Sequence, residues 1–147
     1  MYKRQEQARL SLCGLVGLSD PPRACVQGDI KRCLSAGIRV VMITGDNGVT
    51  ALSIARKVGI PTDGGTITGD QLDVMTDEEL ALRVQNVSVF SRVIPEHKMR
   101  IVKAFQANGH VVAMTGDGVN DAPALKHADI GIAMGQRGSQ DVYKRQV

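Results

Sequence analysis

The sequence predicts an α/β protein with a parallel, doubly wound sheet and helices on both of its faces. Short apolar runs that suit buried strands alternate with segments whose apolar residues recur at helical spacing. Most of these helical segments carry a recognisable cap at one end. Two of the apolar runs end in the same Thr-Gly-Asp turn, so the same polar groups follow two different strands.

Composition indicates one globular domain in a reducing compartment. The 147 residues, 43% of them hydrophobic, suffice for a single core. Aromatic residues make up 3% of the chain and the net charge is +3, so no nucleic-acid partner is expected. The three cysteines are odd in number and lack metal-ligand spacing, which argues against a disulfide framework and a zinc site. The apolar runs are far shorter than a membrane span, so the chain itself is expected to be soluble.

The two ends of the chain carry the same tetrapeptide, Tyr-Lys-Arg-Gln, at residues 2–5 and 143–146. Nothing else around the two copies is similar, so they are interpreted as non-native sequence and not as a functional repeat. We therefore expect the domain to occupy residues 10–141, with 1–9 and 142–147 as non-native or disordered ends.

The first half of the chain is expected to form two strands and two helices. In chain order they are the strand Leu10–Leu18, the helix Ala24–Ala36, the strand Ile38–Ile43 and the helix Thr50–Val58. Gly37 and Gly59 follow the two helices and supply the left-handed residue that commonly ends a helix. The second strand leads directly into Thr44-Gly45-Asp46.

A third Thr-Gly-Asp occurs at Thr68–Asp70, within a segment rich in Gly, Thr and Asp that runs over residues 62–73. Because no buried strand is expected ahead of it, this copy is interpreted as a turn with no part in a site. Thr76 and Glu79 have the spacing of a capping box, which predicts a helix that reaches about Val84.

A strand at Val87–Phe90 and a helix from Pro95 to about Asn108 are expected next. Pro95 and Glu96 suit the start of a helix, whereas Lys98 places a cation against the positive end of the helix dipole. A nearby anion would account for the position of Lys98.

The most informative stretch is Val111–Leu125, VVAMTGDGVNDAPAL. Its apolar start predicts a buried strand, and Asn120 or Asp121 can cap the helix that follows. Ligands bind at the carboxyl ends of strands in such sheets, so Asp117 and Asp121 are expected at the rim of a site, where two carboxylates suit Mg2+. A last strand is expected at Ile130–Met134.

Four strings of the sequence stand out together: DPPR at 20–23, MITGDN at 42–47, FSRVIPEHK at 90–98 and TGDGVNDAPAL at 115–125. In order and spacing they resemble the phosphorylation domain of P-type ATPases, the cation pumps of the haloacid-dehalogenase-like superfamily. The resemblance covers about residues 15–141 and is greatest for the calcium-pump branch. It implies the Rossmann-like parallel sheet of that superfamily, here incomplete.

The resemblance implies catalytic roles for Thr44, Lys98 and Asp117. Thr44 and Gly45 would contact the transferred phosphoryl group, and Lys98 would neutralise phosphate charge. Asp117 would bind Mg2+, with Asp121 as the second metal residue.

The same resemblance implies ATP and Mg2+ as cofactors. Asp46 and Arg92 would lie near the nucleotide, and Asn120 would complete the phosphate surroundings. Asp20 and Arg23 resemble the stretch where the nucleotide-binding domain rejoins this one. The other implied partners are the nucleotide-binding, actuator and transmembrane domains of a parent pump, at the cytoplasmic face of a membrane. The transported cation is not expected to bind this chain.

The implied function is that of a piece of a P-type cation-transporting ATPase, for Ca2+, which couples ATP hydrolysis to ion transport through an aspartyl phosphate. The aspartyl-phosphate motif DKTGT does not occur in the sequence, so the nucleophile is expected elsewhere in the parent and this chain alone is expected to be inactive. Two alternatives stay open. One is a stand-alone phosphatase of the same superfamily with Asp20 as nucleophile, although Pro21-Pro22 follow where such enzymes have small residues and a second acid. The other is a non-catalytic module that binds Mg2+ or a nucleotide.

Overall fold

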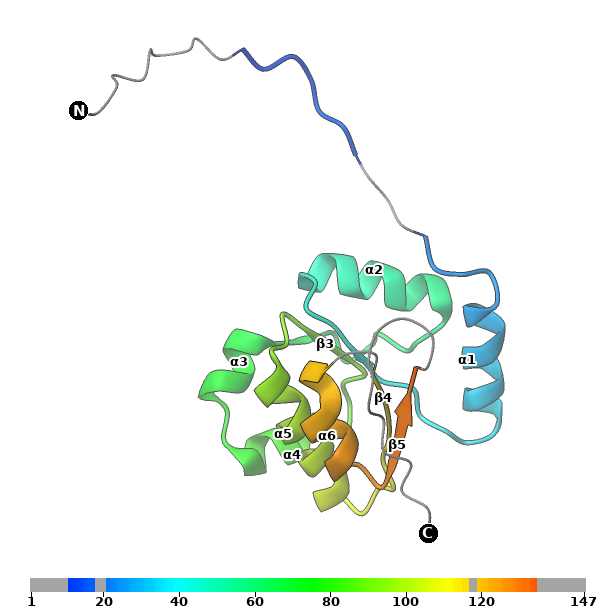
Figure 1. The fold of residues 1–147 in the computed structure, drawn as a ribbon, viewed down its shortest axis with the longest axis vertical. Coiled ribbons are helices and arrows are strands. Elements are labelled where there is room, and N and C mark those ends of the chain that lie inside the picture. The colour runs from blue at the N-terminus through cyan, green and yellow to red at the C-terminus, as the bar shows by residue number, and fades with distance from the viewer. Residues whose placement is uncertain (1–10, 18–20, 117–118, 135–147) are drawn as a thin grey trace, which may run out of the picture.

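The computed structural model describes residues 11–17, 21–116 and 119–134 (Figure 1). The strands are β1 (Met42–Ile43), β2 (Ile67–Thr68), β3 (Val89–Ser91), β4 (Ala113–Gly116) and β5 (Ile130–Ala133). The α-helices are α1 (Val26–Ser35), α2 (Gly48–Val58), α3 (Gly69–Val74), α4 (Asp77–Arg83), α5 (Pro95–Ala107) and α6 (Ala122–His127), and a 3-10 turn, η1, spans Val119–Asp121.

The first sheet has the strand order β1-β3-β2, and all of its pairings are parallel. Successive residues of the central strand β3 point to opposite faces, as the pleat requires. Val89 packs against Ala51 and Ala55 of α2 on one face, whereas Phe90 joins the residues of α3, α4 and α5 on the other. Helices therefore cover both faces of this sheet, which confirms the predicted α/β class.

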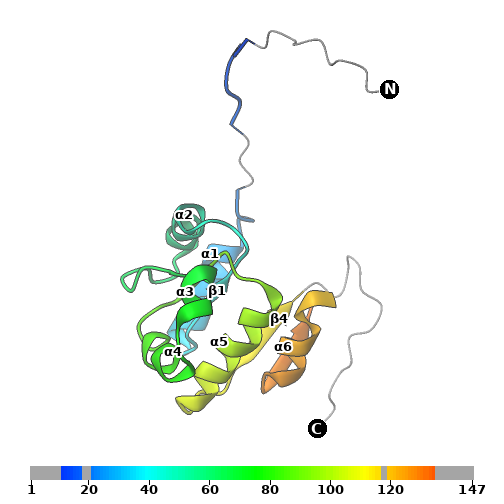
Figure 2. The ribbon, with the colours of Figure 1, turned by 90° about the vertical axis from the view of Figure 1, so that its left-hand side faces the viewer.

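The second sheet consists of β4 and β5, again parallel. Figure 2 shows α5 and α6 beside β4, where Met114 is buried with Val102 of α5 and Ala124 of α6. Ile130 and Ile132 lie on the opposite face and are 51% and 44% exposed. Among the described strands β4 does not pair with β1, so they form two sheets where one incomplete sheet was expected.

The amino ends of β4 and β5 are tied together by Asp129. One of its carboxylate oxygens accepts the Val112 N–H at 2.8 Å and a hydrogen from the Gln106 amide at 3.1 Å. These two hydrogen bonds, the first above all, lower the pKa of Asp129 below its usual value.

The strand predicted at Leu10–Leu18 is wrong over the residues that the structure describes. Residues 11–17 have no regular secondary structure, and Leu12, Leu15 and Val16 are each at least 86% exposed. A strand is stabilised by the neighbour that it pairs with, and no described strand lies beside this segment. Alternation of apolar residues does not supply that neighbour.

The turn predicted at Thr68–Asp70 is also wrong, because Thr68 ends β2 and Gly69 begins α3. Ile67 is fully buried, and Thr68 caps α3 through a reciprocal capping box with Gln71. A strand of two residues gives too short an apolar run to be recognised by periodicity.

The predicted signals at the ends of α1 and α2 and at the starts of α4 and α5 are confirmed. Gly37 and Gly59 adopt the left-handed conformation after α1 and α2, with φ of 75° and 87°. Both hydrogen bonds of the box between Thr76 and Glu79 are present at the start of α4, and Pro95 is the first residue of α5. Both copies of the terminal tetrapeptide lie outside the described residues, so the domain bounds remain a prediction.

Candidate functional site

The loops after β1 and β3 are joined to each other at the carboxyl edge of the first sheet. The Val93 N–H donates to the Thr44 carbonyl at 3.0 Å, and the Arg92 N–H donates to the Asp46 carbonyl at 2.9 Å. Within the first loop the Thr44 hydroxyl accepts the Asp46 N–H and donates to its carboxylate, both at 3.1 Å. Gly45, between them, is exposed. Thr44, Asp46 and Arg92 are thus held in one polar cluster.

Arg92 has a backbone conformation that is unusual for a residue with a side chain, with a φ of 51°. Its carbonyl oxygen lies where α3 begins, since a Cβ built on Gly69 would be 2.1 Å from it. The guanidinium is exposed and lies 3.9 Å from the Asp70 carboxylate. The third Thr-Gly-Asp, interpreted from the sequence as a turn without a role, therefore packs against the loop that carries Arg92.

The end of the second sheet carries an ion pair between Lys98 and Asp121. Lys98 lies in the first turn of α5, and its ammonium contacts one carboxylate oxygen of Asp121, which precedes α6. The two side chains are 22% and 9% exposed. The sequence predicted an anion near Lys98, because this cation opposes the helix dipole, and the carboxylate of Asp121 is that anion.

Gly116 makes room for this ion pair. A Cβ at position 116 would lie 2.7 Å from the Cβ of Asp121 and 2.8 Å from its second carboxylate oxygen. The end of β4 and the carboxylate are therefore in direct contact, which a glycine alone allows without displacement.

The donor chemistry of this edge agrees with a hard cation, although the described residues do not enclose one. Asp121 presents a buried carboxylate, and carboxylate oxygens are ligands that Mg2+ prefers. No group of three acidic, histidine or cysteine side chains gathers in the described part of the chain. Asp117, the predicted direct ligand, lies outside it.

Comparison with known proteins gives a family match over most of the chain. The sequence model described as "Hydrolase: haloacid dehalogenase-like hydrolase" matches residues 4–129. The chain belongs to the haloacid dehalogenase-like hydrolases. This membership agrees with the parallel strands and with the polar groups at their carboxyl ends.

Relatives of this haloacid dehalogenase-like chain include several ion pumps. It is 57% identical over 138 residues to calcium-transporting ATPase 1 of Yarrowia lipolytica, covering 92% of this chain and 15% of that protein. It is 53% identical over 141 residues to the calcium-transporting ATPase of Bacillus subtilis, covering 95% and 16%. A probable cation-transporting ATPase F of Mycobacterium tuberculosis is 52% identical over 136 residues, covering 89% and 15%. The resemblance to P-type ATPases is thereby confirmed, and the chain spans about 15% of the length of these relatives.

The structure brings the predicted site residues of this haloacid dehalogenase-like chain together in two groups. Thr44, Gly45, Asp46 and Arg92 gather at the first sheet, and Lys98 meets Asp121 at the second. Across the described residues, no hydrogen bond or ion pair joins one group to the other.

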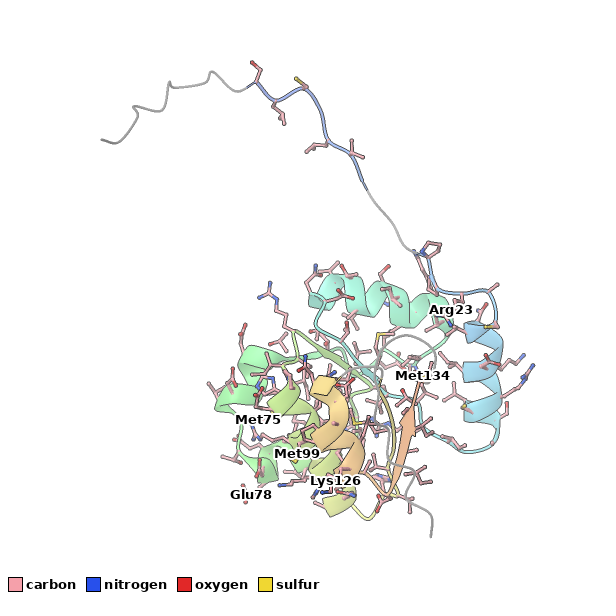
Figure 3. The ribbon with its side chains drawn as sticks, viewed as in Figure 1. Arg23, Met75, Glu78, Met99, Lys126 and Met134 are labelled. Atoms are coloured by element: carbon pink, nitrogen blue, oxygen red, sulfur yellow. The ribbon has the colours of Figure 1, made fainter. Side chains whose placement is uncertain are left out.

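Among the described residues, Asn120 and Arg23 form no hydrogen bond or ion pair with either group. Asn120 is exposed, and Asp117 and Asp20 lie outside the described residues. Arg23, labelled in Figure 3, lies on the surface ahead of α1, where its carbonyl accepts the Val26 N–H at 3.1 Å. The side chain of Asp121 does not cap α6, because it is paired with Lys98.

Sequence reasoning missed His97. This side chain is 4% exposed and contacts Asp73 of α3 with its Nε2 atom at 2.7 Å. Its position next to Lys98, in the first turn of the same helix, was the available signal.

None of the helices in the described ranges is long and apolar enough to cross a bilayer.

Proposed function

We propose that this chain forms part of the phosphorylation domain of a P-type calcium pump, which couples ATP hydrolysis to Ca2+ transport through an aspartyl phosphate. The observation that carries the proposal is the pair of the half-buried Lys98 and the buried Asp121 at the carboxyl ends of the strands. It is supported by identities of 53% and 57% with calcium-transporting ATPases. The pump activity belongs to a much longer protein, of which this chain would supply one part.

In this function Lys98 stabilises negative charge on the transferred phosphoryl group. Phosphoryl transfer depends mainly on positioning and on charge stabilisation, so a fixed ammonium at the strand ends suits it. Thr44 and Gly45 would contact the phosphoryl oxygens from the loop after β1. The hydroxyl of Thr44 is already oriented by the backbone and side chain of Asp46.

Mg2+ would be held by Asp117, with Asp121 beside it. When bound, the ion supplies positive charge to the phosphate oxygens. Asp121 contacts Lys98 with one carboxylate oxygen and has its second oxygen beside Gly116. Asp121 would therefore fix the ammonium and contribute to the metal surroundings from a single buried position.

ATP would be bound with the help of Asp46, Arg92 and Asn120. The guanidinium of Arg92 is exposed, so it is accessible to a nucleotide presented by another domain. Its backbone is fixed by the Asp46 carbonyl, which holds the side chain at the edge of the first sheet. We expect the nucleotide-binding, actuator and transmembrane domains of the parent to be the protein partners, with this domain at the cytoplasmic face.

The nucleophile would come from another part of the parent. Because β1 and β4 are not paired in the described structure, a strand that carries the aspartate can lie between them. Such a strand would end beside both Thr44 and the Lys98–Asp121 pair.

A full-length chimera tests this function. Residues 11–134 replace the matching segment of the Bacillus subtilis calcium-transporting ATPase, to which this chain is 53% identical. We expect ATP-dependent Ca2+ uptake into vesicles and a phosphoenzyme formed from ATP in the presence of Mg2+. A chimera that reaches the membrane in normal amounts but forms no phosphoenzyme would contradict the proposal.

The purified chain itself tests the alternative of a stand-alone phosphatase. We expect it to hydrolyse neither ATP nor simple phosphate esters, since the sequence lacks DKTGT. Turnover that depends on Mg2+ and disappears in Asp20→Asn would show the phosphatase function instead.

A further inference from the structure

The imidazole of His97 links three elements and uses both of its nitrogen atoms. Its Nδ1 atom accepts the N–H of Ile94 at 3.4 Å, and its Nε2 atom lies 2.7 Å from a carboxylate oxygen of Asp73. His97 is 4% exposed, whereas the carboxylate of Asp73 is largely exposed. The ring is therefore fixed at the junction of α3, the loop after β3 and the first turn of α5.

These contacts define which nitrogen carries the proton. An Nδ1 atom that accepts a hydrogen bond has no hydrogen of its own, so Nε2 carries the hydrogen and donates it to Asp73. Each partner thus holds one side of the ring. Ile94 and Asp73 together leave the imidazole a single orientation.

His97 replaces the residue that usually completes a capping box. It is the third residue of α5, where a Glu or Gln side chain commonly reaches back to the N–H of the cap residue, here Ile94. Unlike Glu or Gln, the imidazole also reaches a second element, α3. The start of α5 is consequently held at a fixed angle to the first sheet and its helices.

The residue after His97 is Lys98, whose ammonium contacts Asp121 of the second sheet. Lys98 is in the same helical turn as His97 and points to the α6 side of α5. The angle of this turn therefore determines where the ammonium lies.

Arg100 forms a second link between α5 and the same region, one turn further along. It donates to the carbonyls of Leu72 and Met75 and to the carboxylate of Asp77. These contacts anchor the body of α5 and not its first turn. Arg100 is therefore a matched control for any effect that comes from loosening α5 against α3 and α4.

We propose that His97, with Asp73 as its anchor, is a positioning residue for Lys98. It fixes the first turn of α5 so that the ammonium lies at the carboxyl ends of the strands. This inference rests on the proposed function, because it assigns Lys98 to the transferred phosphoryl group. His97 itself does not touch that group.

The test measures the rate of phosphoenzyme formation from ATP in the full-length Bacillus subtilis chimera. Lys98→Ala is expected to lower the rate on the order of 10²–10³-fold. His97→Ala is expected to lower it by up to about 10²-fold, the scale of a small misplacement. His97→Gln should recover much of the loss, since its amide oxygen can accept the Ile94 N–H. Arg100→Ala should reduce the rate less than His97→Ala while lowering thermal stability comparably.

The double variant of His97→Ala and Lys98→Ala decides the mechanism. If His97 acts through Lys98, the double variant is no slower than Lys98→Ala alone. Two results would overturn the inference and leave the proposed function standing. One is a double variant whose loss of rate is the product of the two single losses, and the other is an Arg100→Ala variant that loses as much rate as His97→Ala. An unchanged rate in Lys98→Ala would overturn the proposed function, and the inference with it.

A milder variant keeps the test decisive if His97→Ala does not fold. Asp73→Asn changes an exposed side chain that can still accept the Nε2 hydrogen, but without its charge. It is expected to slow phosphoenzyme formation several-fold in the presence of Lys98 and not at all in Lys98→Ala. Equal slowing in both backgrounds would contradict the role of His97.

Discussion

Individual residues at the strand ends are under steric as well as electrostatic constraint. Gly116 shows the first kind, because the Asp121 side chain occupies the space of a Cβ there. Lys98 shows the second, since its ammonium is placed against a helix dipole and needs an anion. The sequence predicted the need of Lys98 for an anion but not that Asp121 would be that anion. Packing between β4 and the turn before α6 places Asp121 beside Lys98.

Gly116→Ala is expected to displace the Asp121 carboxylate from Lys98. The added methyl would meet two atoms of Asp121 at 2.7 and 2.8 Å, and overpacking of this kind typically costs about 1–3 kcal/mol of stability. Phosphoenzyme formation in the chimera should fall as well. Gly28→Ala is the matched control, because its Cβ meets nothing within 4 Å and α1 should gain helix propensity. Equal stability of the two variants would contradict the expectation.

Two aspartates in Thr-Gly-Asp motifs are expected to differ sharply in the intact chimera. Asp117→Asn should impair phosphorylation and shift its dependence on Mg2+, at a cost of about 2.7–4 kcal/mol in the transition state. Asp70→Asn should have little effect, because the Asp70–Arg92 pair is exposed and such pairs contribute roughly 0.2–1 kcal/mol. Phosphoenzyme formation measured against Mg2+ concentration checks both. Equal damage by the two substitutions would show that the site was assigned wrongly.

At the scale of elements, the described α-helices other than α3 were predicted from the sequence, and the strands were predicted less well. Thr76, Pro95, Gly37 and Gly59 act through their own backbone or side chain, so their effect can be seen in the local sequence. Strands depend on partners that are distant in sequence. For that reason β2 was missed, and the apolar segment at residues 11–17 was wrongly assigned as a strand.

The β4–β5 pair is expected to lose stability in acid through Asp129. Its pKa is lowered in the folded state by the hydrogen bonds from Val112 and Gln106, so the ionised carboxylate favours folding. That contribution is fully present above the usual pKa of an aspartate and disappears as the pH falls through the lowered value. Melting curves between neutral and acidic pH should show a smaller loss for Asp129→Asn than for the unchanged chain. Parallel losses would contradict this role.

At the scale of the whole molecule, the described strands form two sheets. The sequence predicted an incomplete sheet, because the motif that should carry the nucleophile is absent. It did not show that the described strands would form separate sheets, β1–β3–β2 and β4–β5, since strand pairing depends on segments that are distant in sequence. The candidate site residues were named from the sequence, and their roles stay a prediction. Their grouping into two sets could not be predicted from the sequence.

The isolated chain is expected to expose apolar surface and to associate with itself. Ile130 and Ile132 stand on an uncovered sheet face, and β1 and β4 each have an edge without a described partner. Replacing both isoleucines with Thr keeps the strand propensity and should lower the binding of a hydrophobic dye. A cooperative thermal transition in a strictly monomeric preparation, without dye binding, would contradict this expectation.

The helix α5 gives the two sheets a mechanical connection. It packs with Phe90 of the first sheet through Ile101 and with Met114 of the second through Val102, and its 13 residues form a rod of about 20 Å. His97 and Arg100 attach this rod to α3 and α4, far along the chain from β4. A displacement of α3 and α4 would therefore be transmitted to α5. The Lys98 ammonium would then shift relative to the Asp121 carboxylate.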